Sequence, residues 1–70
     1  MSGYKYAEIA DTIRANIDAG NYPEGRLPST SALCREFSAS YGSVRTAIMI
    51  LKVEGRVVGR QGEGVFVRRA

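Results

Sequence analysis

Hydroxyl and guanidinium side chains gather at two places where helices are expected to begin. Hydroxyl-bearing residues occupy positions 29–31 and recur at Ser40 and Ser43, and Arg45 follows shortly after. The free amides and the dipole of a helix N-terminus favour an anion, and a hydroxyl there either caps the helix or adds a hydrogen bond to a phosphate. The two roles are compatible, so this pattern indicates an anionic partner without requiring one.

The residue sets that most enzymes and metal sites use are missing from this sequence. It has no histidine, a single cysteine, Cys34, and no pair of carboxylates in an apolar setting. A zinc site would need carboxylates alone, and 70 residues leave little room for a substrate cleft. We therefore expect no enzyme, no metal and no cofactor. Cys34 is expected to fill a small buried position, with a redox-sensing thiol as the alternative.

Positive charge is concentrated in the second half of the sequence. Ten Lys and Arg against seven Asp and Glu give a net charge of +3. The residues after Ser31 include seven basic and three acidic side chains, whereas the earlier part has three basic and four acidic ones. One face of the folded protein is therefore expected to be basic, which favours a nucleic acid or another polyanion as partner.

Three helices are expected to position these side chains. Apolar residues at spacings of three and four predict an amphipathic helix over about 5–19, which Gly20 ends. Ser29 is placed to cap a short second helix, and Ser40 a third helix over about 40–54. A short helix, a three-residue turn and a longer helix have the dimensions of a helix-turn-helix unit.

A hairpin is expected after the third helix. Valine-rich stretches at 57–58 and 65–67 flank the polar, glycine-bearing segment 60–64. A very short strand is expected at 26–27. The predicted fold class is therefore mainly α with a small β-hairpin, a winged helix-turn-helix of three helices plus a wing, and residues 1–70 are expected to form one domain.

The core of so small a domain needs nearly all of its large apolar residues. The residues expected inside are Ile9, Ile13, Ile17, Leu27, Leu33, Phe37, Val44, Ile48, Leu51, Val57 and Phe66. Met49, Ile50 and Val53 exceed this set, which leaves them either to pack under the first helix or to form a partner surface.

Several short motifs occur in a set order from the end of the first helix onward. They are Leu27-Pro28-Ser29, Leu33, Phe37, Ser40, Ser43-Val44-Arg45, Ala47, Leu51, Glu54-Gly55 and Gly62-x-Gly64-x-Phe66-Val67. Together they resemble the winged helix-turn-helix DNA-binding domain of the GntR family of bacterial transcriptional regulators, over about residues 6–67. The segment Tyr6-Ala7-Glu8-Ile9-Ala10, together with Ile17, Gly20, Tyr22 and Gly25, and the wing Arg60-Gln61-Gly62-Glu63-Gly64 are most similar to its HutC-like branch.

The resemblance implies sequence-specific binding of double-stranded DNA by a transcriptional regulator, with repression as the commoner outcome. It places the third helix, about 40–54, in the major groove and the wing, 60–64, in the minor groove. The residues expected to contact DNA are Tyr6, Ser29, Thr30, Ser31, Ser40, Tyr41, Gly42, Ser43, Arg45, Thr46, Arg60, Gln61, Gly62 and Gly64. Gly62 and Gly64 either keep the wing tip slim enough for a narrow groove or only close the hairpin.

Arg45 is the residue most suited to contact a base. It follows the apolar Val44 by one position, so it turns about 100° away from the core onto an outward stripe with Tyr41, Met49 and Lys52. A guanidinium there can pair with guanine through two hydrogen bonds, or with a phosphate. The alternative is an ordinary solvated arginine.

The chain departs from the family pattern at three positions that bear on specificity. Thr30 and Ser31 stand where the family usually has Glu and Arg, and Tyr41 stands where it usually has Arg. Two arginines that ordinarily touch DNA are therefore missing, and the usual operator sequence does not carry over.

Two classes of function remain open. The first is a DNA-binding regulator, whose partners are double-stranded DNA and a second copy of the chain on paired half-sites. A small-molecule effector is expected only with the C-terminal domain that the family usually carries. The second class is a winged-helix module for protein interaction, or an architectural accessory factor such as one for phage or plasmid excision. No apolar run approaches the roughly 20 residues that cross a bilayer, so no membrane partner and a cytoplasmic location are expected.

Overall fold

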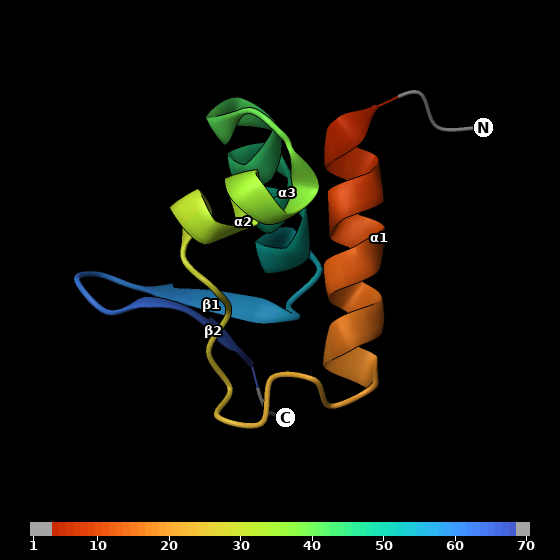
Figure 1. Cartoon of the computed structure of the whole chain (residues 1–70). Helices are drawn as coiled ribbons and strands as arrows, with labels where there is room; N and C mark the ends of the chain where they lie inside the picture. Colours follow the sequence, from red (N-terminus) through yellow and green to blue (C-terminus); the bar gives the residue numbers. More distant parts are fainter. Residues whose placement is uncertain (1–3, 69–70) are drawn as a thin grey trace.

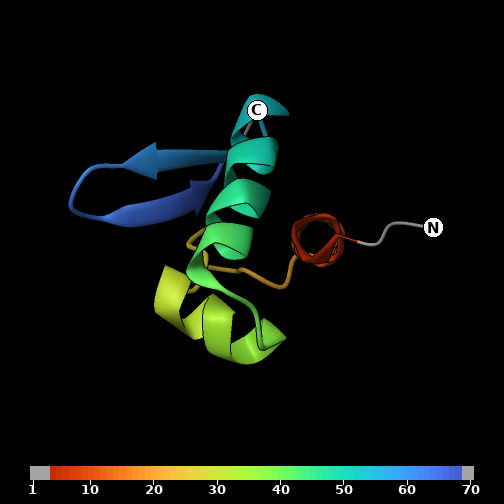
Figure 2. The ribbon, with the colours of Figure 1, turned by 90° about the horizontal axis from the view of Figure 1, so that it is seen from above.

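The computed structural model describes residues 4–68 and confirms the predicted arrangement of three helices and a hairpin. The elements are α1 (Lys5–Asp18), α2 (Thr30–Phe37), α3 (Tyr41–Val53), β1 (Val57–Arg60) and β2 (Gly64–Val67). Figures 1 and 2 show the hairpin extending from one side of the helices, with α1 on the opposite side of α3. The ends of the predicted single domain, 1–3 and 69–70, lie outside the described residues.

Serine caps begin both helices of the helix-turn-helix, as the sequence predicts. Ser29 Oγ accepts a hydrogen bond from the Ala32 amide at 3.1 Å, and Ser40 Oγ accepts one from the Ser43 amide at 3.1 Å. Ser38, at the end of α2, has a left-handed backbone with φ of 51°. This reversal lets the chain leave α2 and begin α3 within three residues.

The core lies between the three helices, and the base of the hairpin closes it. Its buried residues are Ile9, Ala10, Ile13, Leu27, Leu33, Val44, Ala47, Ile48, Leu51 and Val57. Ile17 and Phe37, which were expected inside, are only half-buried, although both pack against this cluster. Both lie in the last turn of their helices, where fewer neighbouring side chains surround them.

The hairpin has one face toward the core and one face away from it. Val57 pairs with Val67 and Val58 pairs with Phe66 in an antiparallel register. Opposed residues of such a pair share a face and neighbours along a strand alternate, so Val57 and Val67 face the core. The expectation that Phe66 lies in the core is therefore wrong: it is half-buried on the outer face with Val58.

The predicted short strand at 26–27 is present as a single bridge to β2. Arg26 pairs with Phe66 in an antiparallel bridge, and the Leu27 amide donates to the Val65 carbonyl at 2.9 Å. The wing tip is shorter than the predicted 60–64, because Arg60 and Gly64 pair within the strands. Residues 61–63 form the turn.

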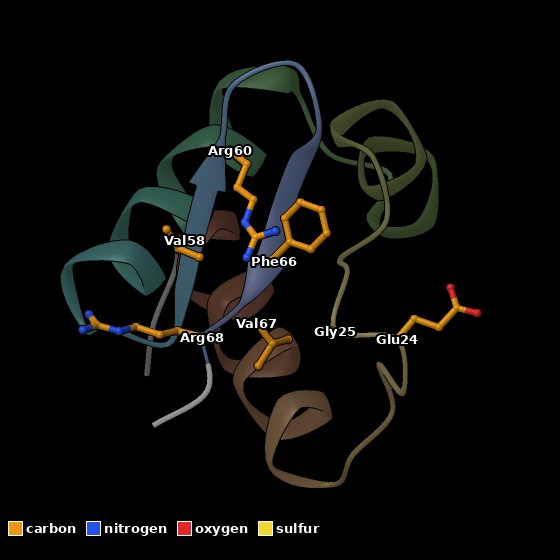
Figure 3. Close-up of a pocket in the computed structure, with 7 residues that line it drawn as sticks. All are labelled: Glu24, Gly25, Val58, Arg60, Phe66, Val67 and Arg68. Atoms are coloured by element: carbon orange, nitrogen blue, oxygen red, sulfur yellow. The ribbon is translucent and has the colours of Figure 1, made fainter.

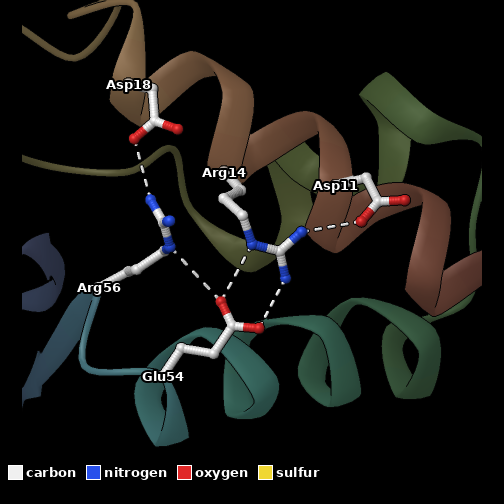
Figure 4. Close-up of polar contacts among 5 residues, drawn as sticks. All are labelled: Asp11, Arg14, Asp18, Glu54 and Arg56. Carbon is white, nitrogen blue, oxygen red and sulfur yellow. Dashed lines mark hydrogen bonds and ion pairs between the residues drawn. The ribbon is translucent and has the colours of Figure 1, made fainter.

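An ion-pair network joins α1 to the end of α3 (Figure 4). Arg14 donates from Nε to Glu54 Oε1 at 3.0 Å and from Nη2 to Oε2 at 2.7 Å, and its Nη1 bonds Asp11 at 2.8 Å. Arg56 adds a bond to Asp18 at 2.9 Å and approaches Glu54 at 3.5 Å. These contacts, those with Arg14 above all, hold the pKa of the Glu54 carboxyl below its ordinary value.

No helix within residues 4–68 is long and apolar enough to cross a membrane.

Candidate nucleic-acid interface

The cations that have an acidic partner lie on α1 or bond to it, whereas those without one lie elsewhere. Lys5, Arg14 and Arg56 form ion pairs with carboxylates on α1 or with Glu54. Six others within residues 4–68 have no acidic partner: Arg26, Arg35, Arg45, Lys52, Arg60 and Arg68. They lie on α2, on α3, in or next to the hairpin, and in the segment that leads to α2. The available positive charge is therefore on the helix-turn-helix and the wing.

The outward stripe predicted on the third helix is present on α3. Tyr41, Arg45, Met49 and Lys52 are all exposed. The Arg45 guanidinium lies over the Tyr41 ring, with Cζ 5.7 Å from the ring centroid. A shallow hollow of about 130 Å³ runs beside the stripe and reaches Thr30 at the start of α2. The structure thus brings the beginnings of both helices and the arginine of α3 to one surface.

The capping serine of α3 and Ser43 in its first turn leave one hydroxyl proton available. Ser40 Oγ accepts from the Ser43 amide and donates to Ser43 Oγ at 3.1 Å. Ser43 can then donate its own proton to an anion at the helix N-terminus. At the start of α2, Ser29 and Ser31 are exposed and Thr30 is half-buried.

Gly42 and Thr46 are exposed on α3, one turn apart. A Cβ placed on Gly42 would meet no heavy atom within 4 Å, and the residue has an ordinary helical backbone. Packing within the described residues therefore gives no reason for a glycine here. A side chain at this position would meet only something that approaches from outside.

The wing tip is exposed and narrow. Gln61, Gly62 and Glu63 form it, and Gly62 and Gly64 have positive φ values of 78° and 118°. Other residues rarely adopt these angles, so closing the hairpin is a sufficient reason for both glycines. The slim tip that results is also the shape that a narrow groove admits.

Arg60 lies below the tip rather than on it. In β1 its guanidinium stacks on the outer-face ring of Phe66, with Cζ 4.7 Å from the centroid (Figure 3). An open hollow of about 470 Å³ continues from this pair along the hairpin to Arg68 and to Glu24 in the loop before α2. The Arg60 guanidinium therefore lies over the ring on the outer face of the hairpin, close to the turn.

Tyr6 is the one predicted contact residue on α1. Its ring is half-buried against the core and stacks on Tyr4, with centroids 5.4 Å apart. Packing accounts for its position, and its contact with phosphate stays a prediction.

Two cations outside the predicted set, Arg26 and Lys52, also lie against the wing. The spacing of seven residues between Arg45 and Lys52 already placed both on one stripe, which is a signal for Lys52. Arg26 had no such signal, because its position depends on the pairing of a loop residue with a distant strand.

The helix-turn-helix, the hairpin and the unpaired cations define a winged helix-turn-helix DNA-binding domain of a transcriptional regulator. The model of bacterial regulatory proteins of the gntR family matches residues 5–67, and the chain belongs to this family. Its assignment to the HutC-like branch stays a prediction.

Curated relatives agree with this assignment. The chain is 36% identical over 64 residues to the uncharacterized HTH-type transcriptional regulator YurK of Bacillus subtilis. It is 39% identical over 62 residues to the putative L-lactate dehydrogenase operon regulatory protein of Escherichia coli. These alignments cover 90% and 87% of the chain but 26% and 24% of the relatives. The chain thus spans about a quarter of the length of the curated relatives that it matches.

Solved structures with this fold include domains bound to DNA. The structure of the AraR DNA-binding domain in complex with operator ORR3 has a TM-score of 0.86 and 32% identity, covering 91% of this chain and 78% of that one. The N-terminal domain of AraR in complex with a mutant ORR3 has a TM-score of 0.89 and 30% identity, covering 97% and 99%.

Proposed function

We propose that this chain binds double-stranded operator DNA sequence-specifically, with α3 in the major groove and the wing in the minor groove, and that it acts in transcriptional repression. The observation that carries the proposal is the exposed stripe of α3, where Arg45 has no acidic partner and is held by Tyr41. A base edge in the major groove is the ligand that a forked guanidinium on a helix can read.

The hydroxyl groups position the domain on the DNA backbone, and they do not recognise bases. Ser29, Ser31, Ser40 and Ser43 lie at or beside the N-termini of α2 and α3, where amides and hydroxyls suit backbone phosphates. The AraR domains of the same fold are bound to operators in their solved structures, which supports DNA as the ligand here.

The wing side of the proposal involves Arg60, Gln61, Gly62 and Gly64. The first two provide a charge and a hydrogen-bonding amide, and the glycines keep the tip narrow. The other proposed DNA contacts on α3 are Tyr41, Gly42 and Thr46. Further contacts to phosphate are proposed for Thr30 and Tyr6.

The remaining features of the proposal concern the whole chain. Residues 1–70 form a single domain without a catalytic step, in the cytoplasm. Its partners are DNA and a second copy of the chain on paired half-sites. A small-molecule effector is proposed only for a longer regulator with a further domain.

Arg45→Ala tests the assignment of α3 as the reading helix. We expect a loss of about 1–3 kcal/mol on a duplex selected from a random library and little loss on a scrambled duplex, because a base contact is removed. Fluorescence anisotropy measures both affinities, and circular dichroism checks that the variant is folded.

Arg35→Ala is the matched control, because Arg35 is an exposed cation without an acidic partner in the last turn of α2. It should bind both duplexes like the wild type. A folded Arg45→Ala variant with unchanged discrimination would contradict the proposal, and a wild-type affinity that does not change with salt would favour the protein-interaction class.

A further inference from the structure

Lys52 of α3 lies over the middle of β1, on the face of the wing that points toward the helices. A Cβ placed on Gly59 would be 3.0 Å from Lys52 Nζ and 3.3 Å from its Cε. Gly59 does not have a left-handed backbone, so its missing side chain provides space and not a special turn. The ammonium group thus lies directly beside the place where another residue at 59 would carry its own side chain.

Arg26 lies on the opposite face of the same hairpin. A Cβ on Gly64 would be 3.3 Å from both Nε and Nη2 of Arg26, and Arg26 Cζ is 5.9 Å from the centroid of Phe66. Phe66 is on the outer face, where Arg60 also stacks on it (Figure 3). The wing therefore has a cation from α3 on one face and a cation from the loop before α2 on the other.

Both cations are available for an external anion. Arg26 and Lys52 are exposed, and neither has an acidic partner among residues 4–68. Both sit within two strand positions of the turn, since Gly59 precedes Arg60 and Gly64 begins β2. Anything that receives the turn 61–63 also comes close to these two charges.

The minor groove of DNA is about 6 Å wide and has a phosphate strand on each side. A hairpin whose turn enters this groove has its two faces toward opposite walls. We propose that Lys52 and Arg26 bind phosphates of the two opposite strands, so that the wing is held from both sides. This inference rests on the proposed function, specifically on entry of the wing into the minor groove.

We call this pair of phosphate contacts, made by Lys52 and Arg26 on opposite strands, the clamp. Lys52→Met and Arg26→Met test it, because methionine keeps an apolar stem and removes the charge. Each variant should lower the slope of log affinity against log salt by about one, equally on the selected and the scrambled duplex, and the double variant by about two. Arg35→Met, with the same loss of charge at the end of α2, should keep the wild-type slope. Lys52→Arg should also keep it.

The strand assignment is tested with duplexes in which single phosphates are replaced by neutral methylphosphonates. Some replacements should lower the affinity of the wild type but not that of Lys52→Met, and these should lie on one strand. Other replacements should lower the affinity of the wild type but not that of Arg26→Met, and these should lie on the opposite strand. The clamp is overturned, with DNA binding intact, if both variants keep the wild-type slope of log affinity against log salt. It is also overturned if the replacements that no longer affect the two variants lie on the same strand. A folded wild-type chain without affinity for either duplex would overturn the proposed function, and the clamp with it.

Discussion

At the scale of single residues, the surface proposed to bind DNA has a guanidinium group that a neighbouring ring orients, and a glycine that leaves room for the duplex. Stacking on Tyr41 restricts the Arg45 guanidinium before any partner arrives, which lowers the entropy lost when it binds. Tyr41 stands at a position where the family usually has arginine. Tyr41 can therefore contact DNA itself and also orient its neighbour Arg45.

Gly42→Ala separates folding from binding at this surface. Because no atom would meet the added methyl group, alanine should stabilise α3 by about 0.5–1 kcal/mol, whereas affinity for DNA should fall if the duplex approaches this turn. Urea denaturation and fluorescence anisotropy measure the two quantities. Thr12→Ala, at an exposed site on α1, is the control and should raise stability by roughly half a kcal/mol without changing affinity. A more stable Gly42→Ala variant with unchanged affinity would remove Gly42 from the proposed contacts.

At the scale of elements, the orientation of α3 depends on α1 more than on the other helix of the helix-turn-helix. Buried residues of α1 and α3 dominate the core, and the Arg14 network ties Glu54, the C-cap residue of α3, to α1 at the surface (Figure 4). This network also occupies two arginines that would otherwise add to the exposed positive charge. The packing of α1 therefore sets both the angle and the charge of the surface that α3 presents.

Glu54→Gln tests the network through its pH dependence. Arg14 lowers the pKa of Glu54 below the ordinary 4.5, so the unfolded chain binds its proton more readily than the folded one. The resulting stability is fully present above pH 4.5 and is lost as pH falls through the pKa of the folded state. Urea denaturation between neutral and acidic pH measures the free energy of unfolding. The values for wild type and Glu54→Gln should converge below the pKa of Glu54 in the folded state. Glu36→Gln, on the exposed face of α2, should track the wild type, and a constant gap between wild type and Glu54→Gln would contradict the network.

At the scale of the whole molecule, the size and the charge distribution of the domain allow two copies to bind next to each other on one face of a DNA duplex. The backbone of the described residues spans 31 × 25 × 20 Å, and its two shorter dimensions are well below the roughly 34 Å of one DNA turn. Two copies can therefore lie side by side on successive major grooves. Arg45 and Lys52 on α3, and Arg26 and Arg60 at the wing, would face the duplex in each copy.

A tethered dimer tests this arrangement. Two copies joined by a flexible linker should bind paired half-sites about 10 base pairs apart at least 100-fold more tightly than one copy does. Half-sites about 15 base pairs apart place the second copy on the opposite face of the duplex and should lose this gain. Anisotropy on both duplexes measures the difference. An equal affinity of tethered and single chains would show that the copies do not engage the two sites together.

Local physics made most of the fold predictable from the amino-acid sequence. The spacing of apolar residues placed α1 and α3, and the capping serines Ser29 and Ser40 marked where α2 and α3 begin. The outward stripe of α3 followed from helical geometry once Val44 was assigned to the core. Such features depend on residues within one or two turns of each other, so a single sequence carries them.

Features that depend on contacts between distant segments required the folded structure. The register of the hairpin put Phe66 outside and stacked Arg60 on it, although an aromatic residue in a valine-rich strand suggests a core position. Arg14 meets Glu54 across 40 positions of the sequence. Arg26 reaches the outer face of the hairpin because a loop residue bridges β2, and Lys52 reaches the other face beside Gly59, which leaves room there. Pairing, register and the reach of long side chains are properties of the assembled elements, and no local pattern encodes them.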